Sequence, residues 1–270
     1  MTSVDVEREH ASSGDTPLPR LRWWREVVYI VVFYVVYSFV RNTGAATDSA
    51  KRAFENAKDI IAIEKAMGLY VERSIQDAFL DWTWFIRLWN IFYGSFHFVV
   101  TAGALVWCFR KMPRRYPKWR NTLAFTTGLA LIGFAFFPLM PPRLLHTVDP
   151  SYGFVDTLAK IGGLWSFDSG TMKSISNQYA AMPSLHFGWS AWSAFVLWPA
   201  TERRPFWRVL VVLYPVATLF AIVVTANHFW LDAVGGAVVL AVGYALGSAL
   251  SAFAASRARS SSSNVAASSS

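Results

Sequence analysis

The chain has 270 residues, of which 54% are hydrophobic and only 16% are charged. Soluble domains carry roughly 25% charged residues, so this composition excludes an ordinary soluble globular protein. The formal net charge of +8 does not indicate a nucleic-acid partner, because the mean hydropathy is +0.33 and long uncharged runs leave little surface for a phosphate-backbone footprint. A single cysteine, Cys108, excludes an intrachain disulfide.

The two ends of the chain differ from its middle. Residues 1–20 are polar with mixed charge, unlike a cleaved secretory signal, and we expect them to form a polar cytoplasmic segment. Residues 256–270 are rich in serine, which predicts a disordered cytoplasmic tail. We expect residues 21–255 to form one membrane domain, which contains the candidate catalytic residues identified below.

Six apolar runs between these ends approach the roughly 20 residues that a membrane-spanning helix needs. They cover residues 21–40, 88–109, 121–140, 183–200, 209–227 and 229–255. Many of the 13 tryptophans fall at the ends of the runs, where amphipathic rings suit the headgroup layer. The sequence therefore predicts an all-α, polytopic membrane bundle of about six transmembrane helices.

Basic residues predict the orientation of this bundle. The segment from Arg110 to Arg120 holds six lysines and arginines, and such short basic connections stay on the cytoplasmic side. We therefore expect a multi-pass protein of the cell membrane with both termini cytoplasmic. The connections after the first, third and fifth spans then face outward.

Two of the outward connections are too long to be simple turns. Residues 47–81 carry apolar side chains at helical spacing, which predicts one or two amphipathic helices lying on the membrane surface, although a solvated helical hairpin fits nearly as well. Residues 144–181 are rich in Gly, Ser, Asp and aromatic residues and predict a structured outer loop.

Four ionisable residues lie at the outer ends of the predicted spans. Arg143 follows the third span, His186 opens the fourth, and His228 and Asp232 open the sixth. Charged groups inside an apolar bundle are costly and need a partner or a function. Because all four fall at one membrane level, the sequence predicts a site at the outer face.

The residue types in this group suit phosphoryl transfer. His228 and Asp232 are four residues apart, so on a helix they share a face, and a carboxylate that holds one imidazole nitrogen makes the other a better nucleophile. His186 could protonate a leaving group. Arg143 offers a fork of donors to phosphate oxygens, and the helix start at Ser184 offers a hydroxyl and free backbone N–H groups.

Two other interpretations of these four residues stay open. The four residues could be structural polar groups in a non-catalytic lipid-handling protein, or His186, His228 and Asp232 could bind a metal. We expect neither a metal nor another cofactor, because Arg143 would lie beside the cation. His97 in the second span is a candidate substrate-binding residue or a packed core histidine, and His146 is interpreted as a surface residue.

Two motifs resemble the type-2 phosphatidic acid phosphatase superfamily, and within it the inositol phosphorylceramide synthase-like branch of inositolphosphotransferases. They are residues 180–186, Ala-Ala-Met-Pro-Ser-Leu-His, and the pattern His228-x-x-x-Asp232. Arg143, in a proline-rich segment, is similar in placement to the basic first motif. The resemblance implies that His228 is the nucleophile, Asp232 orients it, His186 protonates the leaving group, and Arg143 with Ser184 holds the phosphate.

The departures from the ordinary phosphatase pattern favour the synthase-like branch. No lysine lies between Arg120 and Arg143, Leu185 replaces a glycine, and Val223 replaces an arginine five residues before His228. We therefore expect a phosphotransferase or phosphatase that acts on a lipid phosphate in the membrane, with water or a polyol as acceptor. A plain phosphatase acting on phosphatidic acid or a prenyl pyrophosphate is the alternative, and the oligomeric state is left open.

Overall fold

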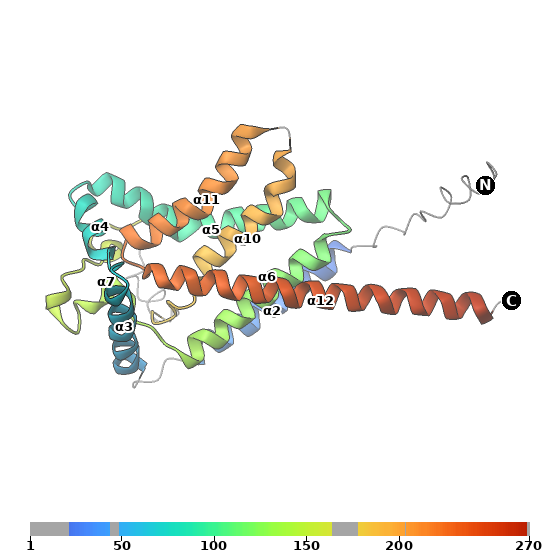
Figure 1. Cartoon of the computed structure of the whole chain (residues 1–270), viewed down its shortest axis with the longest axis horizontal. Helices are drawn as coiled ribbons and strands as arrows, with labels where there is room; N and C mark the ends of the chain where they lie inside the picture. The colour runs from blue at the N-terminus through green and yellow to red at the C-terminus, as the bar shows by residue number, and fades with distance from the viewer. Residues whose placement is uncertain (1–21, 44–48, 164–177, 203, 269–270) are drawn as a thin grey trace.

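The computed structural model describes residues 22–43, 49–163, 178–202 and 204–268, which form a bundle of α-helices (Figure 1). Within these residues the β structure consists of one isolated bridge between Leu139 and Ala180. The prediction of an all-α protein is therefore confirmed for the described part of the chain. The predicted N-terminal segment 1–20 and residues 164–177 of the outer loop lie outside it.

Each of the six apolar runs coincides with a helix. The six are α2 (Trp23–Thr43), α5 (Thr83–Lys111), α6 (Tyr116–Phe136), α10 (Leu185–Leu197), α11 (Pro205–Val224) and α12 (Trp230–Ser268). The 3₁₀ helix η2 (Trp198–Thr201) continues α10. Shorter elements lie between them: α3 (Ser49–Ala66), α4 (Glu72–Phe79), α7 (Pro142–Leu145), η1 (Pro150–Tyr152) and α8 (Thr157–Lys160).

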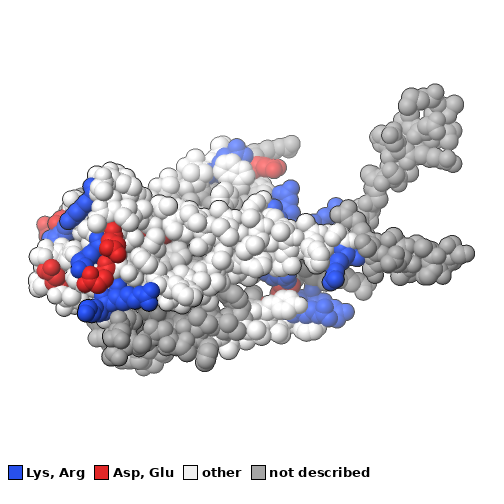
Figure 2. All heavy atoms as spheres, turned by 60° about the horizontal axis from the view of Figure 1, so that its bottom comes forward, with Lys and Arg blue, Asp and Glu red and all other residues white. Residues whose placement is uncertain are grey.

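The described helices include three that are long and apolar enough to cross a membrane: α5, α11, and α12 as far as Arg257. Their outward faces are apolar, and on α12 exposed side chains recur every four residues at Val234, Val238, Val242 and Leu246. Figure 2 shows a broad uncharged belt between charged side chains at the two ends. Such a belt would be unfavourable in water, so the chain is a membrane protein. Helix α10 has 13 residues and is alone too short to span about 30 Å of hydrocarbon.

Glycines set how closely the helices approach. Along the α6–α12 contact, a Cβ at Gly243 would lie 2.5 Å from the Thr126 hydroxyl oxygen, and one at Gly247 would lie 2.7 Å from the Thr122 backbone nitrogen. Small residues four apart allow this kind of close backbone packing in membranes. The α12 glycines therefore hold that helix directly against α6.

A second glycine contact joins α10 to α12. A Cβ at Gly236 would collide with the carbonyl oxygen of Ser184, and Gly188 lies against the carbonyl of Gly236. The Ser184 backbone N–H also donates a hydrogen bond to the Asp232 carbonyl oxygen at 2.8 Å. The first turn of α10, with His186, is thus fixed beside the first turns of α12.

Helices α3 and α4 cover the end of the bundle where α12 begins (Figure 1). The apolar face of α3 includes Ala53, Ala57 and Ile60, and it is buried in one cluster with Leu145 and Phe229. The sequence predicts amphipathic helices here, and the structure contains them. The apolar face of α3 packs on the protein itself, because the loop after α6 and the start of α12 supply an apolar surface. The residues that α4 buries are Glu72 and Gln76.

Helix α12 continues through Ser268, into the serine-rich tail for which composition predicts disorder. Once a helix has formed, each further residue adds one backbone hydrogen bond without a new nucleation cost, so α12 extends beyond its apolar part.

Candidate active site

The turn between α11 and α12 positions His228 and Asp232. Helix α11 ends at Val224, and Ala226 has φ of 55°, a left-handed conformation that an alanine adopts only at a cost. His228 Nδ1 lies 3.0 Å from Asp232 Oδ2, which also accepts the backbone N–H of Phe229 at 3.1 Å. Both side chains are buried. With the Nδ1 proton held by the carboxylate, Nε2 is the nitrogen with a free lone pair.

Three aromatic rings from two other helices surround this pair. The His186 ring centroid lies 5.3 Å from that of His228, in an edge-on arrangement. The Tyr93 ring stacks on His186 at 4.1 Å, and the His97 ring also lies 4.1 Å from it. The structure thus brings together three of the predicted residues, His97, His186 and His228, from α5, α10 and the α11–α12 turn.

The orientation of His97 is set by its own helix. Its Nδ1 hydrogen-bonds to the Tyr93 carbonyl oxygen at 2.9 Å, so that nitrogen carries the proton and Nε2 is an acceptor. His97 is buried, whereas His186 is only half-buried. Of the two, His186 is thus the histidine with an opening to the surroundings.

Arg143, in α7, is tied to the same turn through its backbone. Its N–H donates to the Ala226 carbonyl oxygen at 2.8 Å, two residues before His228. Its guanidinium Nη1 makes an ion pair with Asp156 Oδ2 at 2.6 Å, and its buried Nε has no hydrogen-bond partner within the described ranges. The Arg143 side chain is 13% exposed. It therefore keeps donors that the described protein does not use.

Asp156 is itself fixed by a buried polar network. Its Oδ1 caps α8 by accepting the N–H groups of Leu158 and Ala159, and the next residue, Thr157, donates its hydroxyl to Asn90 Oδ1 at 3.0 Å. Asn90 Nδ2 in turn donates to the Thr157 carbonyl oxygen at 3.0 Å. The loop that carries Asp156 is thereby attached to α5, which fixes the partner of Arg143.

Ser184 and His146 are each held by a hydrogen bond to a backbone group. Ser184 is fully buried and its hydroxyl oxygen caps α10, accepting the Phe187 N–H at 3.4 Å. His146 Nδ1 hydrogen-bonds to the Arg143 carbonyl oxygen at 2.7 Å, next to the site. The cap on α10 fixes the direction of His186.

Sequence reasoning missed two buried carboxyl groups behind His228. Glu72 Oε1 accepts the backbone N–H of Trp230 at 3.0 Å, and Glu64 Oε1 accepts that of Leu231 at 3.3 Å. Burial raises the pKa of both groups, and together with the charge of Glu72 it raises the pKa of Glu64 to about 9. The available signal was spacing: Glu64 follows Ala53, Ala57 and Ile60 on the apolar stripe of α3.

Three other residues around the site were not predicted from the sequence: Tyr93, Asp156 and Asn90. Each makes its contacts with segments far away in the sequence, so no local pattern identifies it.

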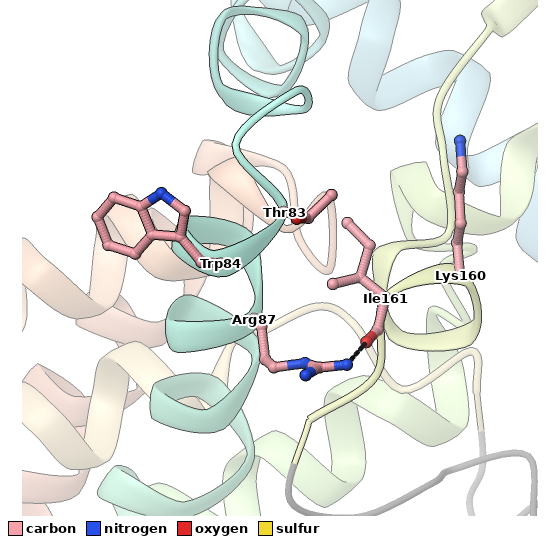
Figure 3. A pocket seen from close by; sticks show the side chains of 5 residues that line it. All are labelled: Thr83, Trp84, Arg87, Lys160 and Ile161. Carbon is pink, nitrogen blue, oxygen red and sulfur yellow. Dashed lines mark hydrogen bonds between the residues drawn. The ribbon is translucent and has the colours of Figure 1, made fainter.

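A pocket of about 400 Å³ opens between the start of α5 and α8. Figure 3 shows its lining residues, Thr83, Trp84, Arg87, Lys160 and Ile161, with Arg87 donating to the Ile161 carbonyl oxygen at 3.2 Å. None of the predicted site residues lines it, so this pocket is distinct from the histidine cluster.

The metal alternative gains no support from the geometry. No group of three His, Cys, Asp or Glu side chains in the described residues is arranged to hold an ion. His228 and Asp232 instead hydrogen-bond to each other.

Comparison with known proteins gives one match. No curated protein and no solved structure is significantly similar. The family model of the PAP2 superfamily matches residues 58–246, which is more than half of the chain and includes every candidate site residue. The inositolphosphotransferase branch is not separately supported by this match. The chain is therefore a membrane protein of the phosphatase type and belongs to the PAP2 superfamily.

Proposed function

We propose that this protein cleaves or transfers the phosphoryl group of a lipid phosphate through a phosphohistidine on His228. One observation carries the proposal: the buried His228–Asp232 hydrogen bond of 3.0 Å, with the His186 ring 5.3 Å from that of His228. A nucleophile oriented by a carboxylate, beside a second group able to move a proton, is the arrangement that nucleophilic catalysis requires.

In the first half-reaction, His228 Nε2 attacks phosphorus and the bond from phosphorus to the leaving oxygen breaks. His186 gives its proton to that oxygen, and Asp232 stabilises the positive imidazole ring. In the second half-reaction, water or an alcohol attacks phosphorus while His186 takes its proton. The nitrogen–phosphorus bond then breaks and His228 is restored.

Arg143 is the proposed anion-binding group. A guanidinium presents planar donors to phosphate oxygens, and the unpartnered Nε of Arg143 and its second terminal nitrogen supply them. We include Ser184 and the N-terminus of α10 in the phosphate site, because helix starts attract anions. His97 packs against His186 and extends the site toward α5.

We further propose a six-span topology with the site at the outer face of the cell membrane and both termini in the cytoplasm. Helices α2, α6, and α10 with η2 would complete the bundle around α5, α11 and α12. Helix α5 runs from Thr83, past the site residues Tyr93 and His97, to Lys111, where the basic segment 110–120 begins. The positive-inside rule assigns that basic end to the cytoplasm.

Whether water or an alcohol completes the reaction is decided in the second half-reaction. We favour transfer to a polyol, since the motif at residues 180–186 resembles the synthase-like branch. No metal or other cofactor has a role in the proposed steps.

The test uses the purified full-length protein in detergent mixed micelles with phosphatidic acid, phosphatidylinositol or a prenyl phosphate, each with and without inositol. We expect an acid-labile, alkali-stable phosphoprotein that maps to His228 and is absent in His228→Ala. Free phosphate would identify hydrolysis, and a new phosphate ester of an alcohol would identify transfer.

Two controls complete the design. Exhaustive EDTA treatment should leave turnover unchanged. If His228→Ala stays folded and retains the parent's turnover, the proposed phosphohistidine mechanism on His228 is wrong. A folded wild-type protein that turns over no lipid phosphate would favour the non-catalytic alternative.

A further inference from the structure

Three hydrogen bonds join the start of α12 to α3, to α4 and to the turn between them. Glu72 accepts the N–H of Trp230, Glu64 accepts that of Leu231, and the Trp230 indole donates to the Leu69 carbonyl oxygen at 2.9 Å. The first N–H groups of a helix have no partner inside the helix, so these carboxyl groups satisfy donors that burial would leave unpaired.

The two glutamates cap consecutive residues. Both side chains are fully buried, and they accept the N–H groups of Trp230 and Leu231. Their Oε2 atoms have no hydrogen-bond partner in the described part of the chain, and an ionised carboxyl group can only accept. One proton held between the two groups would give both Oε2 atoms a partner and leave the pair with one negative charge.

Neighbouring charges make one negative charge on the glutamate pair more favourable than two. The charge of Asp232 contributes to the raised pKa of Glu64, and Asp232 hydrogen-bonds to His228. A helix N-terminus favours a negative charge, but a third carboxylate charge in this region would repel both Asp232 and an anionic phosphate. The other titratable groups facing the pair are Tyr70, with Tyr152 and Arg73 next to that phenol.

We propose that Glu64 and Glu72 are positioning residues that share one proton and hold the first turn of α12, and with it the His228–Asp232 pair, in the geometry for attack. The inference rests on the proposed function for its catalytic consequence. Neither glutamate touches the reacting atoms. Each acts through the backbone of Trp230 and Leu231, within one helical turn of His228 and Asp232.

Substitutions at Glu64 separate hydrogen bonding from charge. Glu64→Gln keeps the acceptor for Leu231 and supplies an N–H donor to Glu72, as the protonated acid does. Glu64→Ala removes both. The matched control is Glu55→Gln with Glu55→Ala, on the exposed face of the same helix, where Glu55 pairs with Lys58.

We expect Glu64→Gln to keep kcat within about threefold of wild type, and Glu64→Ala to lose about 10- to 100-fold in kcat with little change in KM, because misplaced reacting groups slow the chemical step. Wild-type kcat should fall as the pH rises through about 9, where the shared proton is lost, whereas Glu64→Gln should not show that fall. Equal losses in both variants, or an unchanged alkaline fall in Glu64→Gln, would overturn the proposal.

Amide exchange tests the same pair without turnover. In detergent, the peptide containing residues 228–235 should exchange faster in Glu64→Ala than in wild type at pH 7, and faster in wild type than in Glu64→Gln at pH 9.5. The Glu55 variants should match wild type. If the protein turns over no lipid phosphate but this pattern holds, the proposed function fails and the shared-proton cap stands. Equal exchange in all variants refutes the cap itself.

Discussion

The backbone N–H of Arg143 donates to the carbonyl oxygen of Ala226 at 2.8 Å, joining the loop after α6 to the turn that presents His228. The same arginine is held at its other end by Asp156. We expect Arg143→Lys to lower kcat/KM by about 10- to 100-fold, because lysine keeps the charge but loses the planar fork. Asp156→Asn should cause a smaller loss, mainly in KM, since it loosens the guanidinium without removing it. Steady-state kinetics on the lipid substrate measures both, and equal effects would contradict this assignment.

We expect Asp232 to support catalysis by fixing the tautomer of His228. Asp232→Asn can offer Nδ1 an N–H in place of a carboxylate, which favours the wrong imidazole tautomer and removes the charge that balances the phosphohistidine. We expect kcat to fall at least about 100-fold with the fold intact. Rapid-quench measurement of phosphoprotein formation checks this, and a normal rate of adduct formation would exclude the orienting role.

The loss of activity on replacing His186 should increase with the basicity of the leaving group. Glutamine at this position cannot protonate an alkoxide, so turnover of a lipid phosphate should fall about 10²–10⁴-fold. An aryl phosphate with an acidic leaving group needs no proton, and its cleavage should fall less than about tenfold. Comparable losses on both substrates would show that His186 is not the general acid.

Gly236 should be intolerant of a side chain. In Gly236→Ala the new methyl group collides with the Ser184 carbonyl and pushes α10 from α12, at a cost of about 1–3 kcal/mol. Because His186 and His228 lie on either side of this contact, activity should fall as well. Gly103→Ala in α5 is the matched control, since a Cβ there meets nothing within 4 Å, and it should be neutral or stabilising by up to about 1 kcal/mol. Thermal melting in detergent compares the two.

The buried Glu64 should make stability depend on pH. Its pKa of about 9 in the fold lies above the ordinary value of 4.5, so its contribution is fully present below pH 4.5 and is lost as the pH rises to about 9. The slope is at most about 1.4 kcal/mol per pH unit. Glu64→Gln cannot ionise, so its melting temperature should decline less than that of wild type between pH 5 and 9. The exposed Glu55→Gln should keep the wild-type slope, and identical slopes in all three proteins would place Glu64 in contact with solvent.

Several features followed from sequence alone because they depend on local periodicity. The lengths of the apolar runs predicted the helices that became α5, α11 and α12, and the apolar spacing around Ala53 and Ala57 predicted an outer amphipathic helix. The interval of four residues predicted that His228 and Asp232 lie within reach of each other on one helix. The two side chains do hydrogen-bond, but His228 lies in the turn before α12, which begins at Trp230. The resemblance at residues 180–186 indicated the superfamily that the family comparison supports.

Other features required the packed chain, because each joins residues far apart in sequence. No periodic pattern in the sequence indicates the Arg143–Asp156 ion pair or the stacking of Tyr93 on His186. The same is true of the hydrogen bonds by which Glu64 and Glu72 cap α12. The sequence by itself determined where the long apolar helices form and which residues are candidates for phosphoryl transfer. Only the tertiary structure decided which carboxyl groups are buried together behind His228, because that depends on how α3 and α4 pack over the end of the bundle and remove those groups from water.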